Sequence, residues 1–330
     1  MFDAANDKNT GKLPDMHVYE EYGWLRGMNI IPSWAARIEE AWWLYDPECF
    51  RQEIALGKKI HLNCIRLWFE FTAWMADPEK MLANFLDAIV AIDESGMKTM
   101  PCLFNTWHDS VWDYGGTYEI NMRRNLEGHF EYVRALGKAL ANDNRILAWD
   151  LCNEPDSTTT ETVEYRWLEQ IAAELRNCKV RQPITIGTTM TTFSGDDANM
   201  NTFAPLCDVL CCHPYSKTTD QMECYHKIIK QVQKTHEKPM LCNESIPGCL
   251  DDLKRAKCAR FNVDALENAG WGWMGWGMKE GKAVATRRDR YDINGIDGQG
   301  FHAWFKKDGA LRDGLDFLLA PPENKAPWIS

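Results

Sequence analysis

Eight short apolar runs recur along the chain and constrain its fold more than any other feature. They lie roughly 35 residues apart, and most are continuous, with no alternation between polar and apolar residues. Such runs are typical of parallel strands covered on both faces. They are Trp24–Ile30, Leu62–Phe69, Lys98–Asn105, Ile146–Cys152, Pro183–Thr188, Val209–His213, Pro239–Asn243 and Trp271–Trp276. In a chain of 330 residues they predict one α/β domain, a single (β/α)8 TIM barrel, with a doubly wound open sheet as the alternative.

Amphipathic segments occupy the spaces between these runs. Asp46-Pro47 and Asp77-Pro78 each begin a helix, with Asp as the N-cap and Pro at the first helical position, and Gly96 ends the second. Further helices are predicted over Glu127–Ala141, Thr160–Lys179, Asp196–Ala204, Thr218–His236 and Asp251–Asn268. No Gly-, Ser- or Pro-rich linker divides the chain. We therefore expect an N-terminal extension, residues 1–20, and a barrel, residues 21–330, that includes the segment after the last strand.

Composition excludes several classes of protein. The 37 basic and 48 acidic residues give a net charge of −11, which argues against a nucleic-acid partner. No apolar stretch approaches about 18 residues, so no membrane span is expected. The 12 cysteines are interpreted as free thiols, because several fall inside apolar runs of a long chain. Met1–Asp15 is polar and lacks the apolar core of a signal peptide, so we expect a cytoplasmic protein of undetermined oligomeric state.

Polar and aromatic side chains gather where the apolar runs end. The catalytic groups of a parallel barrel lie at the C-terminal ends of its strands. Grouping polar side chains there costs stability, so a functional reason is expected. The residues at these ends include Arg66, Trp68, Glu70, Trp107, His108, Asn153, Glu154, His213, Tyr215, Asn243, Glu244 and Trp276.

Glu154 and Glu244 form the central pair of this set. They follow the fourth and seventh runs, which lie across the barrel mouth from one another. Carboxylates about 5–5.5 Å apart serve as nucleophile and acid/base in a retaining glycosidase, whereas about 6.5–9.5 Å leaves room for a water and inverts the stereochemistry. The sequence leaves both separations open. The structural alternatives are that Glu154 opens a helix and that Glu244 is an ordinary strand-end charge.

Arg66 and Tyr215 fit a role beside an ionised nucleophile, because a guanidinium and a phenol hydroxyl favour the charged form of a carboxylate. Arg66 could instead pair with Glu70, His213 could be a core histidine, and Asn153 could be only a helix cap. The indole of Trp34, which follows the first run, is predicted to stack on a sugar ring, with packing of a loop as the alternative.

The ordered set resembles the clan A glycoside hydrolases, most closely the cellulase and mannanase-like family 5. The resemblance is carried by Asn153-Glu154-Pro155, His213-x-Tyr215 and Glu244, with Arg26-Gly27-Met28-Asn29 and Trp276, over about residues 22–280. It implies that Glu154 is the acid/base and Glu244 the nucleophile, with retention of configuration. It also implies which residues line the sugar subsite nearest the cleaved bond: Arg66, His108, Asn153, His213, Tyr215 and Trp276.

These observations predict a retaining β-glycosidase that acts on a β-linked oligosaccharide or glycoside without a cofactor or metal ion. No His-x-His pair is present, and adjacent side chains in Cys211-Cys212-His213 point to opposite faces of a strand, which argues against a zinc site. The alternatives are a carbohydrate-binding barrel without catalysis and a barrel hydrolase that grips an acidic sugar through the Arg287–Arg290 run.

Overall fold

The computed structural model describes residues 18–106, 126–190, 198–287 and 301–329. Most of the expected N-terminal extension lies outside the described residues. His108 and most of the Arg287–Arg290 run also lie outside them.

Parallel strands form one sheet in the order β7-β6-β5-β4-β3-β2-β1-β8. The strands are β1 (Arg26–Ile30), β2 (Cys64–Trp68), β3 (Lys98–Cys102), β4 (Trp149–Asn153), β5 (Ile184–Thr189), β6 (Leu210–His213), β7 (Met240–Leu241) and β8 (Trp273–Trp276). Two backbone hydrogen bonds join the sheet's ends, from Cys242 N to Trp271 O at 3.2 Å and from Ser245 N to Met274 O at 2.9 Å. The prediction of a single (β/α)8 barrel is confirmed.

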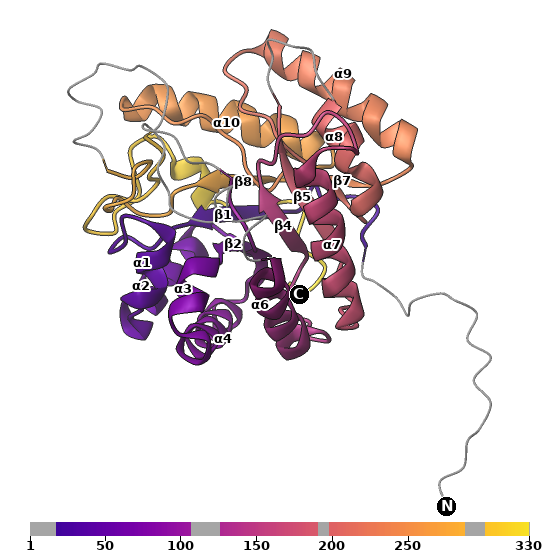
Figure 1. Ribbon diagram of the computed structural model, residues 1–330. Coiled ribbons are helices and arrows are strands. Elements are labelled where there is room, and N and C mark those ends of the chain that lie inside the picture. The colour runs from indigo at the N-terminus through magenta and orange to yellow at the C-terminus, as the bar shows by residue number, and fades with distance from the viewer. Residues whose placement is uncertain (1–17, 107–125, 191–197, 288–300, 330) are drawn as a thin grey trace, which may run out of the picture.

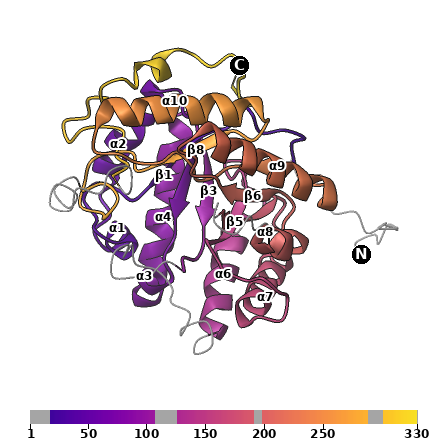
Figure 2. The same ribbon diagram turned by 90° about the horizontal axis from the view of Figure 1, so that it is seen from above.

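Helices surround the strands on the outside of the molecule, as Figure 1 and Figure 2 show. They are α1 (Ile38–Trp43), α2 (Pro47–Lys59), α3 (Phe71–Ala76), α4 (Pro78–Glu94), α6 (Leu126–Leu140), α7 (Val163–Asn177), α8 (Ala198–Phe203), α9 (Thr219–His236) and α10 (Asp252–Asn268), with short 3-10 turns η1 (Ala204–Leu206) and η2 (Asp316–Leu319). The predicted caps are present: Asp46 accepts from Cys49 N and Asp77 from Lys80 N, both at 3.0 Å.

The described part of the segment after β8 packs against the barrel. Trp304 stacks on Trp273 of β8, with ring centroids 5.6 Å apart. Arg312 forms ion pairs with Asp252 of α10 and with Glu280. The segment, yellow in Figure 2, runs along α10.

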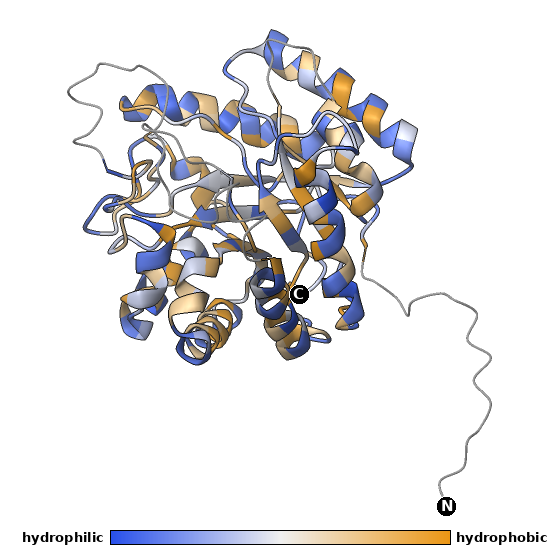
Figure 3. Cartoon of the chain, viewed as in Figure 1, coloured by the Kyte–Doolittle hydropathy of each residue, from blue (hydrophilic) through white to orange (hydrophobic). Residues whose placement is uncertain are grey.

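Apolar side chains fill the shell between strands and helices, and Figure 3 shows the helices alternating between hydrophilic and hydrophobic residues. All twelve cysteines are free, as predicted. In the described parts of the chain, none of the helices is both long and apolar enough to cross a membrane.

The interior of the barrel is divided into an apolar and a polar layer. Cys64, Met100, Ala148, Cys211 and Leu241 belong to a small separate apolar cluster. Along a strand, side chains two residues apart point to the same face. The next inward positions toward the C-terminal ends are Arg66, Cys102, Asp150, His213 and Asn243, most of them polar and all buried. The fold therefore places a polar layer directly beneath the barrel mouth.

Candidate active site

Arg66 of β2 lies at the centre of the polar layer and is fully buried. Its Nε donates to Asp150 Oδ2 at 2.8 Å, and Nη2 lies 2.6 Å from the same oxygen. Nη1 donates to Asn29 Oδ1 at 2.7 Å and to Glu244 Oε2 at 2.9 Å, and Nη2 donates to Asn153 Oδ1 at 2.9 Å. Every guanidinium N–H group therefore has an acceptor, as a buried charge requires. The alternative pairing with Glu70 is wrong, because Glu70 caps α3 through Ala73 N instead.

Glu244 follows β7 and is held as a carboxylate by two donors. Arg66 contacts Oε2, and the Tyr215 hydroxyl donates to Oε1 at 2.6 Å. Burial by itself would raise the pKa of Glu244. The charges of His213 and Arg66 and the bond from Tyr215 outweigh burial and hold this pKa below its ordinary value. Such a carboxylate is ionised at neutral pH.

Glu154 follows β4 in a backbone conformation that directs its side chain toward His213 and Glu244. Its φ of 51° is left-handed, a local strain typical of functional sites, and its N–H donates to Gly187 O at 2.8 Å. Its Oε1 lies 2.7 Å from Nδ1 of His213. Burial raises the pKa of Glu154, and the bond to His213 only partly opposes this. The two carboxyl groups therefore have pKa values displaced in opposite directions.

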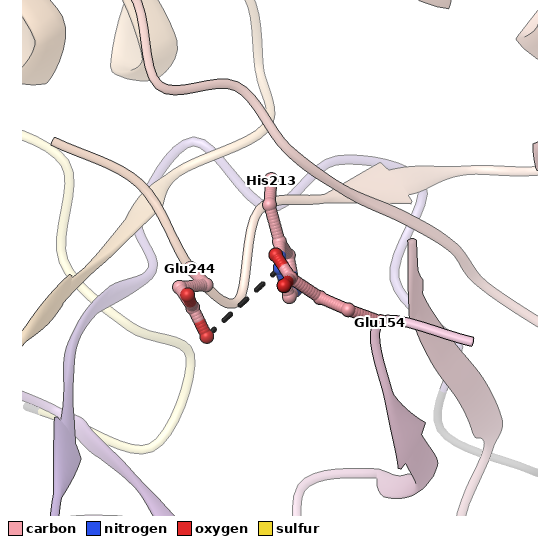
Figure 4. A group of neighbouring side chains, drawn as sticks. All are labelled: Glu154, His213 and Glu244. Carbon is pink, nitrogen blue, oxygen red and sulfur yellow. Dashed lines mark hydrogen bonds and ion pairs between the residues drawn. The ribbon is translucent and has the colours of Figure 1, made fainter. Parts of the chain in front are cut away.

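The carboxyl groups of Glu154 and Glu244 lie close together with the ring of His213 beside them, as Figure 4 shows. One oxygen of each carboxyl group and one nitrogen of His213 all lie within 4.8 Å of one another. Such a trio could also surround a cation, but the Arg66 guanidinium 2.9 Å from Glu244 already balances that carboxylate's charge. The arrangement favours an acid and a nucleophile on either side of one bond.

The other predicted site residues differ in what surrounds them. Asn153 accepts from Arg66 and donates to Asn105 Oδ1 at 3.1 Å, so its amide is fixed beside Glu154. Trp276 of β8 is buried and stacks on Trp68, with ring centroids 5.2 Å apart. Trp34 is half-buried and lies edge-on against Phe50. Among the described ring contacts and hydrogen bonds, none joins Trp34 to the carboxyl pair, so its contact with a sugar remains a prediction.

Sequence reasoning missed two buried residues of this region, Asp150 and His302, and gave Asn243 no role beyond its place at a strand end. Asp150 lies inside an apolar run, Asn243 ends one, and both join the network around Arg66 and His213. His302 belongs to the segment after β8, where no repeat marks it. Its ring packs edge-on against Tyr215 with centroids 6.0 Å apart, and burial lowers its pKa to about 4, so it is neutral at neutral pH.

Comparison with known proteins shows similarity in sequence and in fold. A stretch of 112 residues is 32% identical to mannan endo-1,4-beta-mannosidase A of Podospora anserina, and the match covers 31% of this chain and 30% of that protein. Two solved structures share the fold. The exo-beta-1,4-mannosidase Op5Man5 from Opitutaceae bacterium strain TAV5 has a TM-score of 0.70 at 17% identity, over 89% of this chain and 58% of that chain. GH5_18 from Streptomyces cattleya in complex with GlcNAc has a TM-score of 0.71 at 15% identity, over 91% and 79%.

The family comparison covers most of the barrel. The model for cellulase (glycosyl hydrolase family 5) matches residues 26–281, from the first residue of β1 to just beyond β8. This range contains Arg66, Glu154 and Glu244, and it ends before His302. The chain therefore belongs to glycosyl hydrolase family 5.

Proposed function

We propose that this protein is a retaining β-glycosidase in which Glu244 is the nucleophile and Glu154 the acid/base. In the first step Glu244 attacks the anomeric carbon while Glu154 protonates the glycosidic oxygen, so the bond to the leaving group breaks as the glycosyl-enzyme bond forms. In the second step water attacks the anomeric carbon, Glu154 takes its proton, and Glu244 leaves. Protons and bonds balance without a cofactor.

The observation that carries the proposal is the close pair of carboxyl groups with opposed pKa displacements. One oxygen of each carboxyl group lies within 4.8 Å of the other, which is closer to the roughly 5–5.5 Å between the carboxyl groups of retaining enzymes than to the roughly 6.5–9.5 Å that inverting enzymes leave for a water. The lowered pKa suits a nucleophile, and the raised pKa suits a group that must carry a proton near neutral pH.

The surrounding residues have distinct proposed roles. Arg66 and Tyr215 hold the nucleophile ionised and oriented, and both contact it directly. Asn153, whose amide is held by Arg66 and Asn105, is proposed to bind a sugar hydroxyl next to Glu154. Trp276, whose ring stacks on Trp68, is proposed to present an apolar surface to a pyranose ring. His108 and Trp34 remain proposed contacts of the same substrate.

β-1,4-Linked mannosides are the first substrates to test. The curated relative is named an endo-1,4-beta-mannosidase and one structural neighbour an exo-beta-1,4-mannosidase. The chain spans about a third of the first and somewhat more than half of the second, so the sugar and the choice between exo- and endo-action are part of the proposal.

A panel of aryl β-glycosides tests the function directly. We expect the wild type to cleave the mannoside or a related neutral sugar, and the product anomer, followed by proton NMR, to retain the β configuration. Glu154→Ala should lose turnover and regain it with added azide, which forms a β-glycosyl azide. Glu267→Gln is the matched control, because Glu267 pairs with Arg26 where β1 begins, far along the barrel axis from this site. Inversion at the anomeric carbon would overturn the mechanism.

A further inference from the structure

His213 faces an oxygen atom at each of its two ring nitrogens. Nδ1 lies 2.7 Å from Glu154 Oε1, and Nε2 lies 2.9 Å from Asn243 Oδ1. The ring is almost completely buried, so neither contact is exchanged for water. Whether Nδ1 can accept a proton from Glu154 therefore depends on whether Asn243 Oδ1, at the other ring nitrogen, can only accept a hydrogen bond.

The orientation of the Asn243 amide answers that question. Its Nδ2 donates to Asp150 Oδ2 at 2.9 Å, and Asp150 is paired with Arg66 and accepts from Gly187 N at 3.1 Å. A carboxylate in an ion pair only accepts, so the amide nitrogen must face Asp150 and the amide oxygen must face His213. The thiol of Cys211 also donates to this oxygen, at 2.8 Å.

An amide oxygen accepts but never donates, so Nε2 must carry a hydrogen. We propose that Asn243 is a positioning residue that keeps a proton on Nε2 of His213, so that the proton of Glu154 is shared with Nδ1 alone. This role rests on the proposed function of Glu154. When Glu154 is protonated it donates to Nδ1 of a neutral ring, and when it is ionised it accepts from Nδ1 of an imidazolium.

Gly187 of β5 leaves the space that this contact needs. A Cβ atom at this position would lie 2.6 Å from His213 Nε2 and 3.1 Å from Asn243 Oδ1. Atoms this close cannot coexist, and both groups are held by further bonds. The His213–Asn243 bond therefore requires a glycine at position 187, on the neighbouring strand β5.

The consequence is that the Glu154–His213 pair resists losing the proton that Glu154 shares with Nδ1. A neutral ring carries a hydrogen on only one of its nitrogens. Beside an ionised Glu154 both nitrogens would face acceptors, so the lone pair of the other nitrogen would lie against an oxygen. Without Asn243 the neutral ring could place its hydrogen on Nδ1 and donate to the ionised Glu154. The pair would then lose that proton at lower pH.

Nitrogen-15 NMR of histidine-labelled protein tests the proton position without any substrate. We expect Nε2 of His213 to give the signal of a protonated nitrogen throughout about pH 5–8, with only Nδ1 responding to pH. His213→Gln identifies the signal among the 8 histidines. An unprotonated Nε2 in this range overturns the proposal, even if the enzyme cleaves β-glycosides. The same readout is valid if no such activity is found, so the two failures are distinguishable.

The pH dependence of kcat provides the second test. Asn243→Leu should move the alkaline limb about one unit to lower pH, a tenfold change in proton affinity. Thr188→Val is the matched control, because it removes a buried hydrogen bond of 2.8 Å to Cys211 O in the neighbouring strand pair without touching His213. A purely structural defect lowers the whole curve and leaves its inflection in place, and that result in Asn243→Leu overturns the proposal.

Discussion

The bond from Tyr215 to Glu244 offers a sharp test of how the nucleophile is kept ionised. Tyr215→Phe removes one donor at 2.6 Å and leaves the Arg66 contact at 2.9 Å on the other oxygen. Glu244 is buried, so the lost bond is poorly replaced by solvent. A hydrogen bond to a charged group is worth about 1.5–3 kcal/mol, and one pKa unit corresponds to about 1.4 kcal/mol. The pKa of Glu244 should therefore rise by about 1–2 units.

The sign of the effect follows from the role of the ionised form. Glu244 attacks only as a carboxylate, so a raised pKa moves the acid limb of kcat/KM to higher pH by the same amount. The assay is the pH dependence of kcat/KM on the best aryl β-glycoside of the panel. The alkaline limb should stay in place, because Tyr215 makes its described bond to Glu244 and not to Glu154.

Tyr132→Phe is the control for loss of a buried tyrosine hydroxyl. Tyr132 is fully buried and donates to Leu103 O at 3.0 Å, away from both carboxyl groups. It should lower stability by about 1 kcal/mol and leave both limbs unchanged. An acid limb that does not move in Tyr215→Phe, while stability falls as in the control, would refute the electrostatic role of Tyr215.

Three further predictions concern stability and packing. Arg66→Met leaves the buried carboxylates of Asp150 and Glu244 unbalanced and should lower the unfolding free energy by about 3–5 kcal/mol in urea titrations; a loss below about 1 kcal/mol contradicts the charge balance. Burial raises the pKa of Glu70 to about 8, so the native state binds a proton that the unfolded state releases, and stability falls as pH rises from about 4 to 8. Glu70→Gln should therefore raise Tm relative to the wild type at pH 8 and not at pH 4. An equal difference in Tm at the two pH values would contradict the raised pKa of Glu70. Gly187→Ala should lower kcat strongly and change KM little, because the Cβ of the new alanine displaces the His213 ring. Unchanged kinetics would mean that the His213 ring is not confined by Gly187.

The barrel could be predicted from the sequence because its strands are covered on both faces and read as continuous apolar runs. The structure confirms the long helices, which show amphipathic periodicity and Asp-Pro starts. It adds α1 and α3, which the sequence did not predict. Each has six residues, too few for a periodic signal, and α3 is anchored by Glu70 as its N-cap.

The site was only partly predictable, for a reason that lies in β4. Asp150 and Asn153 both contact Arg66, although an odd spacing places side chains on opposite faces of a regular strand. An irregularity in the pairing of β4 with β5 between these two residues turns both inward. The sequence showed the polar residues at the strand ends, Asn243 among them, but it did not show this shift, the buried partner Asp150, or the bonds of Asn243 to Asp150 and His213.

The identity of the nucleophile is the central claim, and trapping the covalent intermediate tests it most directly. A 2-deoxy-2-fluoro-β-glycosyl fluoride of the preferred sugar should slow release of the glycosyl-enzyme, and mass spectrometry of a proteolytic digest should then place one sugar on Glu244. We expect stoichiometric labelling there in the wild type and none in Glu244→Gln. Labelling of Glu154, or of any other residue, would contradict the account.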